Sequence, residues 1–218
     1  MTLSDRFFSD LAALGARRGS DPAIFLTAWC VESGLNPHAI NAIGARGLNQ
    51  MLPSTLTAIG APADFESLSG EAQLPWIEKL IASGEHRNGG PFDSAARYYH
   101  ANFFPVTMAR GNTAETIVAA RDAADPRESQ AYAFNAALDA DGDGKITLGD
   151  LASVLNRVHP KFDAAFARLD AARQSLPNAP WQPASLVAQT QKGAAAVGAV
   201  VLAGMIALAF ARHSWVHA

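Results

Sequence analysis

The sequence is poor in cysteine and has no excess of basic residues, and both absences exclude kinds of protein. Its 218 residues include one cysteine, Cys30, so neither an intrachain disulfide nor a cysteine-based zinc site can form. The formal net charge of −3 provides no basic surface for a polyanion. We therefore expect no nucleic acid among the partners of this protein.

A conventional secretion signal is also missing from the start of the sequence. Residues 1–5 read Met-Thr-Leu-Ser-Asp and lead into a mixed polar and apolar stretch. Secretion signals instead combine a basic start, an apolar run and a cleavage site of small residues. We expect no signal peptide, so an enzyme with a substrate outside the cytoplasm would have to reach it by another route.

Alternation of polar and apolar residues with period two is rare, so the sequence predicts an all-α protein with little sheet. A first helix is expected around residues 7–14 with Gly19 as its C-terminal cap, and a second after Asp21-Pro22, ending near Gly34. Pro75 should begin or kink its helix, and 86–91 should form a loop. Further helices are expected over 54–59, 74–82, 94–104 and 113–123, and in three stretches between Asp125-Pro126 and residue 174.

The C-terminal part of the sequence contains a long apolar run. Residues 193–211 carry no charged side chain and lie between Lys192 and Arg212. A run of about 19 apolar residues is at the low end of what spans a bilayer as a helix. We expect a transmembrane helix at 193–212, after a linker at 177–192 and before a tail at 213–218. A buried core helix or a surface hairpin is the alternative, and one cation at each end leaves the orientation open.

Glu32 is the candidate catalytic residue. It stands near the C-terminal end of the second predicted helix, beside Trp29, Cys30 and Val31. An apolar setting without a cation raises the pKa of a carboxyl group, so we expect Glu32 to hold its proton near neutral pH. Such an acid can protonate the leaving oxygen of a glycosidic bond. The alternative is an ordinary glutamate at the exposed end of a helix.

The residues that follow Glu32 form two motifs. Residues 32–37 read Glu-Ser-Gly-Leu-Asn-Pro, and residues 44–55 read Gly-Ala-Arg-Gly-Leu-Asn-Gln-Met-Leu-Pro-Ser-Thr. This pattern resembles the soluble lytic transglycosylase family, which shows Glu-Ser-Gly-x-Asn-Pro and then Gly-Ala-x-Gly-Leu-x-Gln-x-x-Pro-x-Thr. The resemblance covers residues 1–125 and implies a lysozyme-like catalytic domain that acts on peptidoglycan.

The resemblance also implies a reaction that needs no cofactor. The bond between MurNAc and GlcNAc would be cleaved with formation of 1,6-anhydro-MurNAc. Glu32 would first protonate the leaving oxygen and then deprotonate the 6-hydroxyl of the same sugar. No second acid lies close by in the sequence, where Asp64 and Glu66 come next. A muramidase that adds water, and a non-enzymatic membrane-anchored protein that binds glycan or serves a structural role, are the alternatives.

Four residues near Glu32 are candidate substrate-binding residues. Gly47 and Leu48 would shape the loop beneath the cleft, since glycine lets the backbone approach a sugar closely. The resemblance makes Gln50 a substrate contact, and its amide can both donate and accept hydrogen bonds. Ser33 resembles the family's serine near the cleavage subsite, although a cap at the helix end is equally open.

A second candidate region contains two tyrosines. Residues 96–105 read Ala-Arg-Tyr-Tyr-His-Ala-Asn-Phe-Phe-Pro, where the family usually has Ala-Tyr-Asn-Ala-Gly. The sequence is closer to the phage-type form Leu-Tyr-x-x-Asn-Phe-x-Pro. Tyr99 is the candidate that steadies the catalytic carboxyl group or the intermediate, and Tyr98 is the second choice; both could instead be core aromatics. Asn102 could line the cleft or cap its helix.

An acidic loop at residues 139–150 resembles the calcium loop of an EF-hand. The candidate ligands are Asp139, Asp141, Asp143, the Lys145 carbonyl, Thr147 through a water, and Asp150. The last position is usually a bidentate glutamate, and aspartate is one methylene shorter. We expect a structural Ca²⁺ site, with an acidic surface turn that holds no metal as the alternative.

The sequence thus predicts a lysozyme-like catalytic domain at 1–125 and an EF-hand-like helical extension at 126–176. The missing signal peptide, the phage-like tyrosine motif and the apolar tail favour a virion protein of a phage, which would open the cell wall during genome entry. A bacterial enzyme held in the inner membrane and acting in the periplasm, within an envelope complex, is the rival interpretation.

Overall fold

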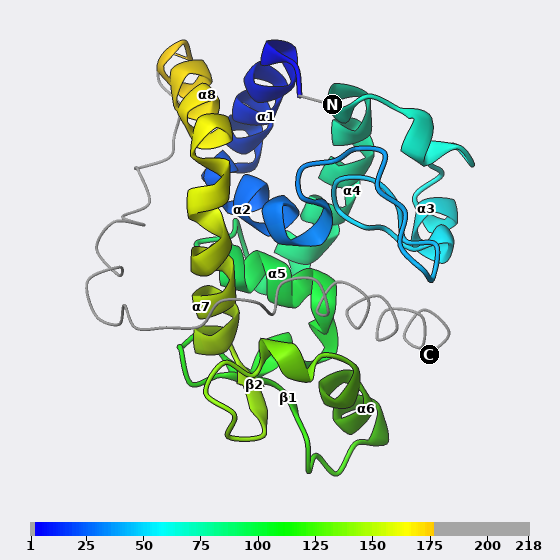
Figure 1. Cartoon of the computed structure of the whole chain (residues 1–218), viewed down its shortest axis with the longest axis vertical. Coiled ribbons are helices and arrows are strands. Elements are labelled where there is room, and N and C mark those ends of the chain that lie inside the picture. Colours follow the sequence, from blue (N-terminus) through cyan, green and yellow to red (C-terminus); the bar gives the residue numbers. More distant parts are fainter. Residues whose placement is uncertain (1–2, 177–218) are drawn as a thin grey trace.

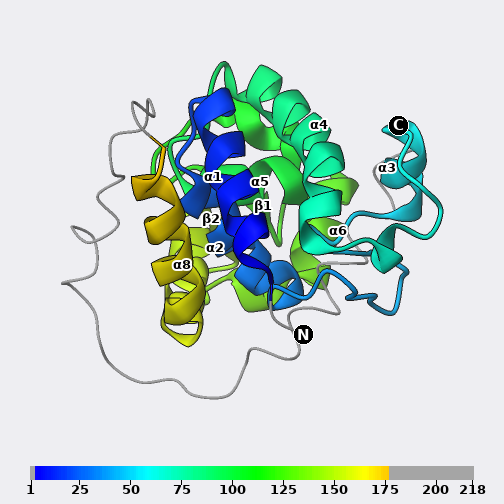
Figure 2. The same ribbon diagram turned by 90° about the horizontal axis from the view of Figure 1, so that it is seen from above.

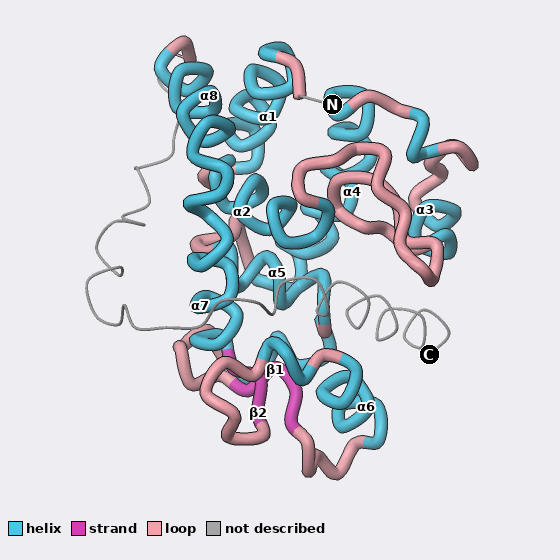
Figure 3. The backbone as a smooth tube through the Cα atoms, viewed as in Figure 1, coloured by secondary structure: helices cyan, strands magenta, loops and turns pink. Residues whose placement is uncertain are grey.

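The computed structural model describes residues 3–176. The expectation of a mostly helical chain is confirmed for this part (Figure 3). None of its helices is both long and apolar enough to cross a membrane. The linker at 177–192, the transmembrane helix at 193–212 and the tail at 213–218 lie outside the described residues.

The first two helices begin and end where local signals in the sequence place them. Helix α1 spans Asp5–Arg18 and ends at Gly19, whose φ of 69° is left-handed. Helix α2 spans Pro22–Ser33; the Asp21 side chain caps its first turn, and Gly34 ends it at φ 62°. Every residue of α2 up to Glu32 is buried, because the helix crosses the centre of the molecule (Figure 1).

Three further helices complete the part of the chain before residue 104. These are α3 (Pro53–Ala58), α4 (Gly70–Asn88) and α5 (Ala95–Phe103), with a 3₁₀ turn η1 at Phe65–Ser67. The expected bounds of α4 are wrong at both ends. The Ser69 side chain caps its start, so Pro75 lies inside the helix. Gly89 ends it at φ 80°, so the first half of the expected loop at 86–91 is helical.

The prediction of a helix over 113–123 is wrong. After a 3₁₀ segment η2 (Pro105–Arg110), the chain forms strand β1 (Ile117–Ala120). This strand pairs antiparallel with β2 (Lys145–Thr147), which lies within the acidic loop at 139–150. Ile117 and Val118 are β-branched and favour the extended backbone, and Val118 and Ala119 are fully buried.

The remaining elements pack directly against the first part of the chain. They are α6 (Pro126–Phe134), η3 (Ala136–Leu138), α7 (Leu148–Val158), η4 (His159–Phe162) and α8 (Asp163–Gln174). Helix α7 contacts α5 and α2, and α8 lies beside α1 (Figures 1 and 2). Arg173 of α8 also binds the Asp21 carboxylate at 3.1 Å. One continuous apolar core therefore crosses residue 125, where the sequence predicts a domain boundary.

A buried histidine joins α5 to β1. His100 is fully buried; its Nδ1 faces Arg97 Nη1 at 3.4 Å and its Nε2 lies 2.9 Å from Thr107 Oγ1. Because a guanidinium group can only donate, Nδ1 accepts and Nε2 carries the proton. Thr107 Oγ1 in turn lies within hydrogen-bonding distance of the Val118 carbonyl, at 2.9 Å. Burial, followed by the charge of Arg97, lowers the pKa of His100 to about 3.

This histidine is expected to make the fold sensitive to acid. The unfolded His100 takes up a proton below its ordinary pKa of 6.5, whereas the folded one stays neutral down to about 3. Stability is therefore lost as the pH falls through this window, by at most about 1.4 kcal/mol per pH unit for one proton. Urea unfolding at pH 7, 5.5 and 4 should show a shallower decline for His100→Asn than for the wild type. Parallel declines in the two proteins would contradict this assignment.

Candidate active site

Glu32 lies in the last turn of α2 and is 6% exposed. The chain reverses immediately after it, because Gly34 and Leu35 both adopt left-handed φ angles, of 62° and 60°. Their backbone N–H groups point at the carbonyl of Trp29, which ends the helix. The candidate acid therefore stands at a buried helix end, next to a sharp turn of the backbone.

Ser33 is half-buried beside Glu32, and its hydroxyl group donates to the Trp29 carbonyl at 3.2 Å. This bond within the helix end agrees with the capping alternative. The oxygen of the same hydroxyl can still accept a hydrogen bond from a ligand.

The segment between α2 and α3, residues 34–52, forms a folded loop that is tied to the segment before α4. Backbone bridges join Arg46 to Ile40 and to Met51. The Arg46 guanidinium group pairs with the Glu66 carboxylate at 2.9 Å, and His38 Nδ1 lies 2.6 Å from the Glu66 carbonyl. These contacts tie the loop to the segment before α4.

Position 47 requires glycine. Its φ of 75° is left-handed, and an added Cβ atom would lie 2.6 Å from both the Gln73 amide oxygen and the Phe65 ring. The next residue, Leu48, is fully buried, and its N–H donates to Gln73 Oε1 at 2.9 Å. The structure thus places Leu48 in the core and leaves it no surface for the substrate contact predicted from the sequence.

Gln50 has a left-handed backbone, at φ 43°, which is uncommon for a residue other than glycine. Its side-chain nitrogen donates to the carbonyl groups of Gly47 at 2.9 Å and Ala39 at 3.3 Å. Gln50 is therefore held in one orientation, with 5% of its surface exposed. Strained backbone of this kind gathers at functional sites.

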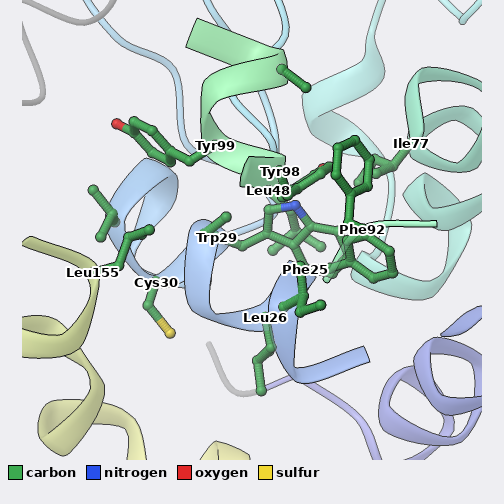
Figure 4. Packing of buried hydrophobic residues seen from close by; sticks show 14 of the residues in the cluster. Phe25, Leu26, Trp29, Cys30, Leu48, Ile77, Phe92, Tyr98, Tyr99 and Leu155 are labelled. Atoms are coloured by element: carbon green, nitrogen blue, oxygen red, sulfur yellow. The ribbon is translucent and has the colours of Figure 1, made fainter. Parts of the chain in front are cut away.

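The two candidate tyrosines point in different directions from α5 (Figure 4). The Tyr98 ring packs edge-on against Phe25 and Phe92, at 5.0 and 5.3 Å between ring centres, and its hydroxyl group donates to Asn49 Oδ1 at 2.8 Å. Tyr98 is thus a core aromatic, which was the alternative weighed for it. The Tyr99 ring points away from that group, and it is also buried.

Asn102 lies one turn after Tyr98 on α5 and is half-buried. Its Nδ2 atom is buried and makes no hydrogen bond to residues 3–176. A buried amide nitrogen without a partner requires a water or a ligand as acceptor.

Cys30, on α2, is also buried. Burial raises the pKa of its thiol to about 12, so Cys30 behaves as an inert core residue.

The acidic loop brings three carboxylates together. One oxygen from each of Asp139, Asp141 and Asp143 lies within 4.8 Å of the others. The loop backbone orients them: Gly142 and Gly144 donate to Asp139, and the N–H of Asp143 donates to Asp141. Although burial opposes it, the hydrogen bond from Tyr132 and those from the backbone lower the pKa of Asp139.

The remaining candidate ligands of this loop are placed differently. Asp150 Oδ2 accepts from the Thr147 hydroxyl at 2.6 Å and from its N–H at 2.8 Å, which makes a capping box at the start of α7. Asp150 Oδ1 accepts from the Ala140 N–H at 3.1 Å. Asp150 thus closes the loop through hydrogen bonds. The Lys145 ammonium group lies 3.7 Å from Asp143, and Lys145 is exposed.

Two buried amides, Asn49 and Gln73, hold the site together although the motif gives them no role. Gln73 is fully buried; its nitrogen donates to the carbonyl of Pro37 at 2.6 Å, and its oxygen accepts from Leu48. It therefore joins α4 to both halves of the 34–52 loop. The sequence signal for it is weak, because a glutamine inside a helix usually faces solvent.

Comparison with known families finds a match in the first half of the chain. Residues 11–74 match the model of the transglycosylase SLT domain. The matched stretch begins in α1 and includes α2, the 34–52 loop, α3 and the start of α4. No curated protein and no solved structure matches the chain. The part of the chain that carries Glu32 thus has the sequence features of a transglycosylase SLT domain.

Proposed function

We propose that this protein is a lytic transglycosylase that cleaves the glycan strands of peptidoglycan with Glu32 as its single acid and base. The observation that carries the proposal is the burial of Glu32 at the end of α2, inside the stretch that matches the SLT domain. Proteins seldom bury glutamate, and a buried carboxyl group can serve as a general acid.

The proposed reaction uses no water. Glu32 gives its proton to the oxygen that leaves with GlcNAc, while the bond from that oxygen to C1 of MurNAc breaks. The resulting carboxylate then takes the proton of the 6-hydroxyl of MurNAc, whose oxygen bonds to C1. The products are 1,6-anhydro-MurNAc and a free 4-hydroxyl on GlcNAc, and Glu32 regains its proton.

The surrounding residues are proposed to position the sugar. Gln50 and Ser33 would contact substituents of the sugar, and Gly47 would let the backbone approach it. Tyr99 would steady the carboxyl group or the intermediate. The buried amide nitrogen of Asn102 would donate a hydrogen bond to an oxygen of the substrate. Residues 3–176 provide no other acceptor for it.

Mass spectrometry of purified sacculi digested by the protein tests this proposal. The expected muropeptides are lighter by one water than those released by a hydrolase, because the anhydro ring replaces an added water. Products that carry the extra water would instead identify a muramidase. Absence of any released muropeptide would favour a protein that binds glycan without cleaving it.

We further propose that the acidic loop binds Ca²⁺ as a structural ion. The donors fit this ion, because the three side chains that lie close together are carboxylates and Ca²⁺ prefers oxygen ligands. Asp139, Asp141 and Asp143 would hold the ion, with the Lys145 carbonyl, Thr147 and Asp150 as further candidates.

Calcium is expected to stabilise the fold through this loop. At a free concentration about 100-fold above Kd, the ion would add about 2.7 kcal/mol to the free energy of unfolding. Thermal unfolding in Ca²⁺ and in EDTA should show a Tm difference of several degrees, which Asp141→Asn reduces. Asp10→Asn, at a side chain of α1 that is 47% exposed, is a control that should keep the difference. An equal Tm with and without Ca²⁺ in the wild type would refute the site.

The place of action is proposed from the sequence. A virion protein of a phage would cut the wall locally during genome entry, and the apolar run at 193–211 would place it in a membrane. Detection of the protein in purified virions would support this proposal. A gene located within a bacterial envelope operon, with no protein in virions, would favour an enzyme anchored in the inner membrane.

A further inference from the structure

Asn49 connects the 34–52 loop to two helices through one atom. Its Oδ1 accepts hydrogen bonds from the indole N–H of Trp29 at 3.0 Å and from the Tyr98 hydroxyl group at 2.8 Å. Trp29 belongs to α2 and Tyr98 to α5, and all three side chains are buried. Figure 4 shows the Trp29 ring between the two helices, close to Leu48 and Tyr98.

This contact lies between the candidate acid and a candidate substrate contact. Trp29 stands three residues before Glu32, so the two side chains share a face of α2. A hydrogen bond to the Trp29 ring is therefore a bond to the helix end that carries Glu32. Gln50 follows Asn49 directly in the chain, so its position depends on where Asn49 is held.

The loop has little freedom to compensate for a change at Asn49. On one side, the N–H of Leu48 is bound to Gln73, and Gly47 packs against Phe65 without room for a Cβ atom. On the other side, Gln50 adopts a left-handed backbone that persists only where its surroundings impose it. Because the loop cannot rearrange internally, loss of the hydrogen bond between Asn49 and Trp29 would move the loop as a unit and shift Gln50 relative to α2.

We propose that Asn49 is a positioning residue that sets the distance between Glu32 and Gln50. The proposal rests on the glycan cleavage proposed above, because its effect is read from that reaction. The pattern that this sequence resembles leaves the position between Leu48 and Gln50 variable, so the resemblance assigns no role to it. An amide that served stability alone would change the folded fraction and leave the kinetic constants unchanged.

Asn49→Leu tests the proposal, because it keeps the size of the side chain and removes the accepting oxygen. Assayed on sacculi below the unfolding range, it should lower kcat/KM about 10- to 100-fold, with kcat itself reduced, since small misplacements of reacting groups have effects of this size. Asn49→Asp retains an accepting oxygen and should recover most of the activity. Trp29→Phe removes the indole N–H that donates to Asn49 Oδ1 and should also lower kcat.

A matched control exists at Asn135, which like Asn49 is 1% exposed and whose amide nitrogen donates to the Ala131 carbonyl. Asn135→Leu should lower Tm and leave kcat and KM unchanged. The inference is overturned if Asn49→Leu and Trp29→Phe keep the wild-type kcat and KM while the wild type is active. Should Asn49→Leu not fold, Trp29→Phe decides alone. An inactive wild type would instead overturn the proposed function, and the inference with it.

Discussion

Replacing Glu32 by glutamine is expected to reduce the release of muropeptides from sacculi by about 10²- to 10⁴-fold, the range that general acid–base groups contribute. Glutamine has nearly the same shape, but it can neither give a proton to the leaving oxygen nor take one from the 6-hydroxyl. Because Glu32 is proposed to perform both steps, no other group would replace it. Turbidity of a sacculus suspension and chromatography of the soluble products measure the effect.

A burial-matched control separates loss of chemistry from loss of fold. Glu85 is 7% exposed, against 6% for Glu32, and it pairs with Arg18 between α1 and α4. Glu85→Gln should lower Tm while keeping kcat, whereas Glu32→Gln should stay folded and lose activity. Unchanged lysis of the wall by Glu32→Gln would refute the catalytic assignment.

A chain cut after residue 125 is expected not to fold. The hydrophobic side chains that residues 126–176 add to the core, each at most 8% exposed, are Ala131, Tyr132, Leu138, Ile146, Leu148, Leu151, Leu155, Val158, Phe166 and Leu169. Full burial of one such side chain is worth about 1.5–3 kcal/mol, and a whole domain is stable by only about 5–15 kcal/mol. The stabilisation lost with these side chains and with β2, the partner strand of β1, therefore exceeds the free energy of unfolding of a typical domain.

Circular dichroism and thermal unfolding of the two chains check this expectation. A chain that ends after residue 176 keeps every described element and should unfold in one cooperative transition, whereas the chain 1–125 should show none. A shorter chain that unfolds cooperatively and degrades sacculi would make residues 126–176 an independent module.

Local signals made part of this structure predictable. Asp21 and Gly34 mark both ends of α2, because a capping carboxylate and a left-handed glycine act within a few residues of themselves. The position of Glu32 at the end of a buried helix follows from the same signals. Its burial was inferred from apolar neighbours, and the 6% exposed fraction agrees with that inference.

Features set by distant contacts were not predictable in the same way. Strand β1 has four residues, too few to show a period, and its partner β2 lies on the far side of α6 in the sequence. The burial of Leu48 was not predictable either, because the motif carries no information on which residues pack against that position. Gln73 and Asn49 gain their roles only when α4, α2 and α5 are assembled.

The ion pair between Asp21 and Arg173 has a consequence for how the chain is made. Its two residues are 152 positions apart in sequence, and Arg168 reaches Asp5 across 163 positions. On the ribosome, the first two helices emerge long before the segment that covers them. Contacts between residues so far apart in sequence slow folding. The first helices therefore expose apolar surface until α8 has been synthesised. Synthesis of this protein should therefore depend on chaperones that shield the nascent chain until α8 has emerged.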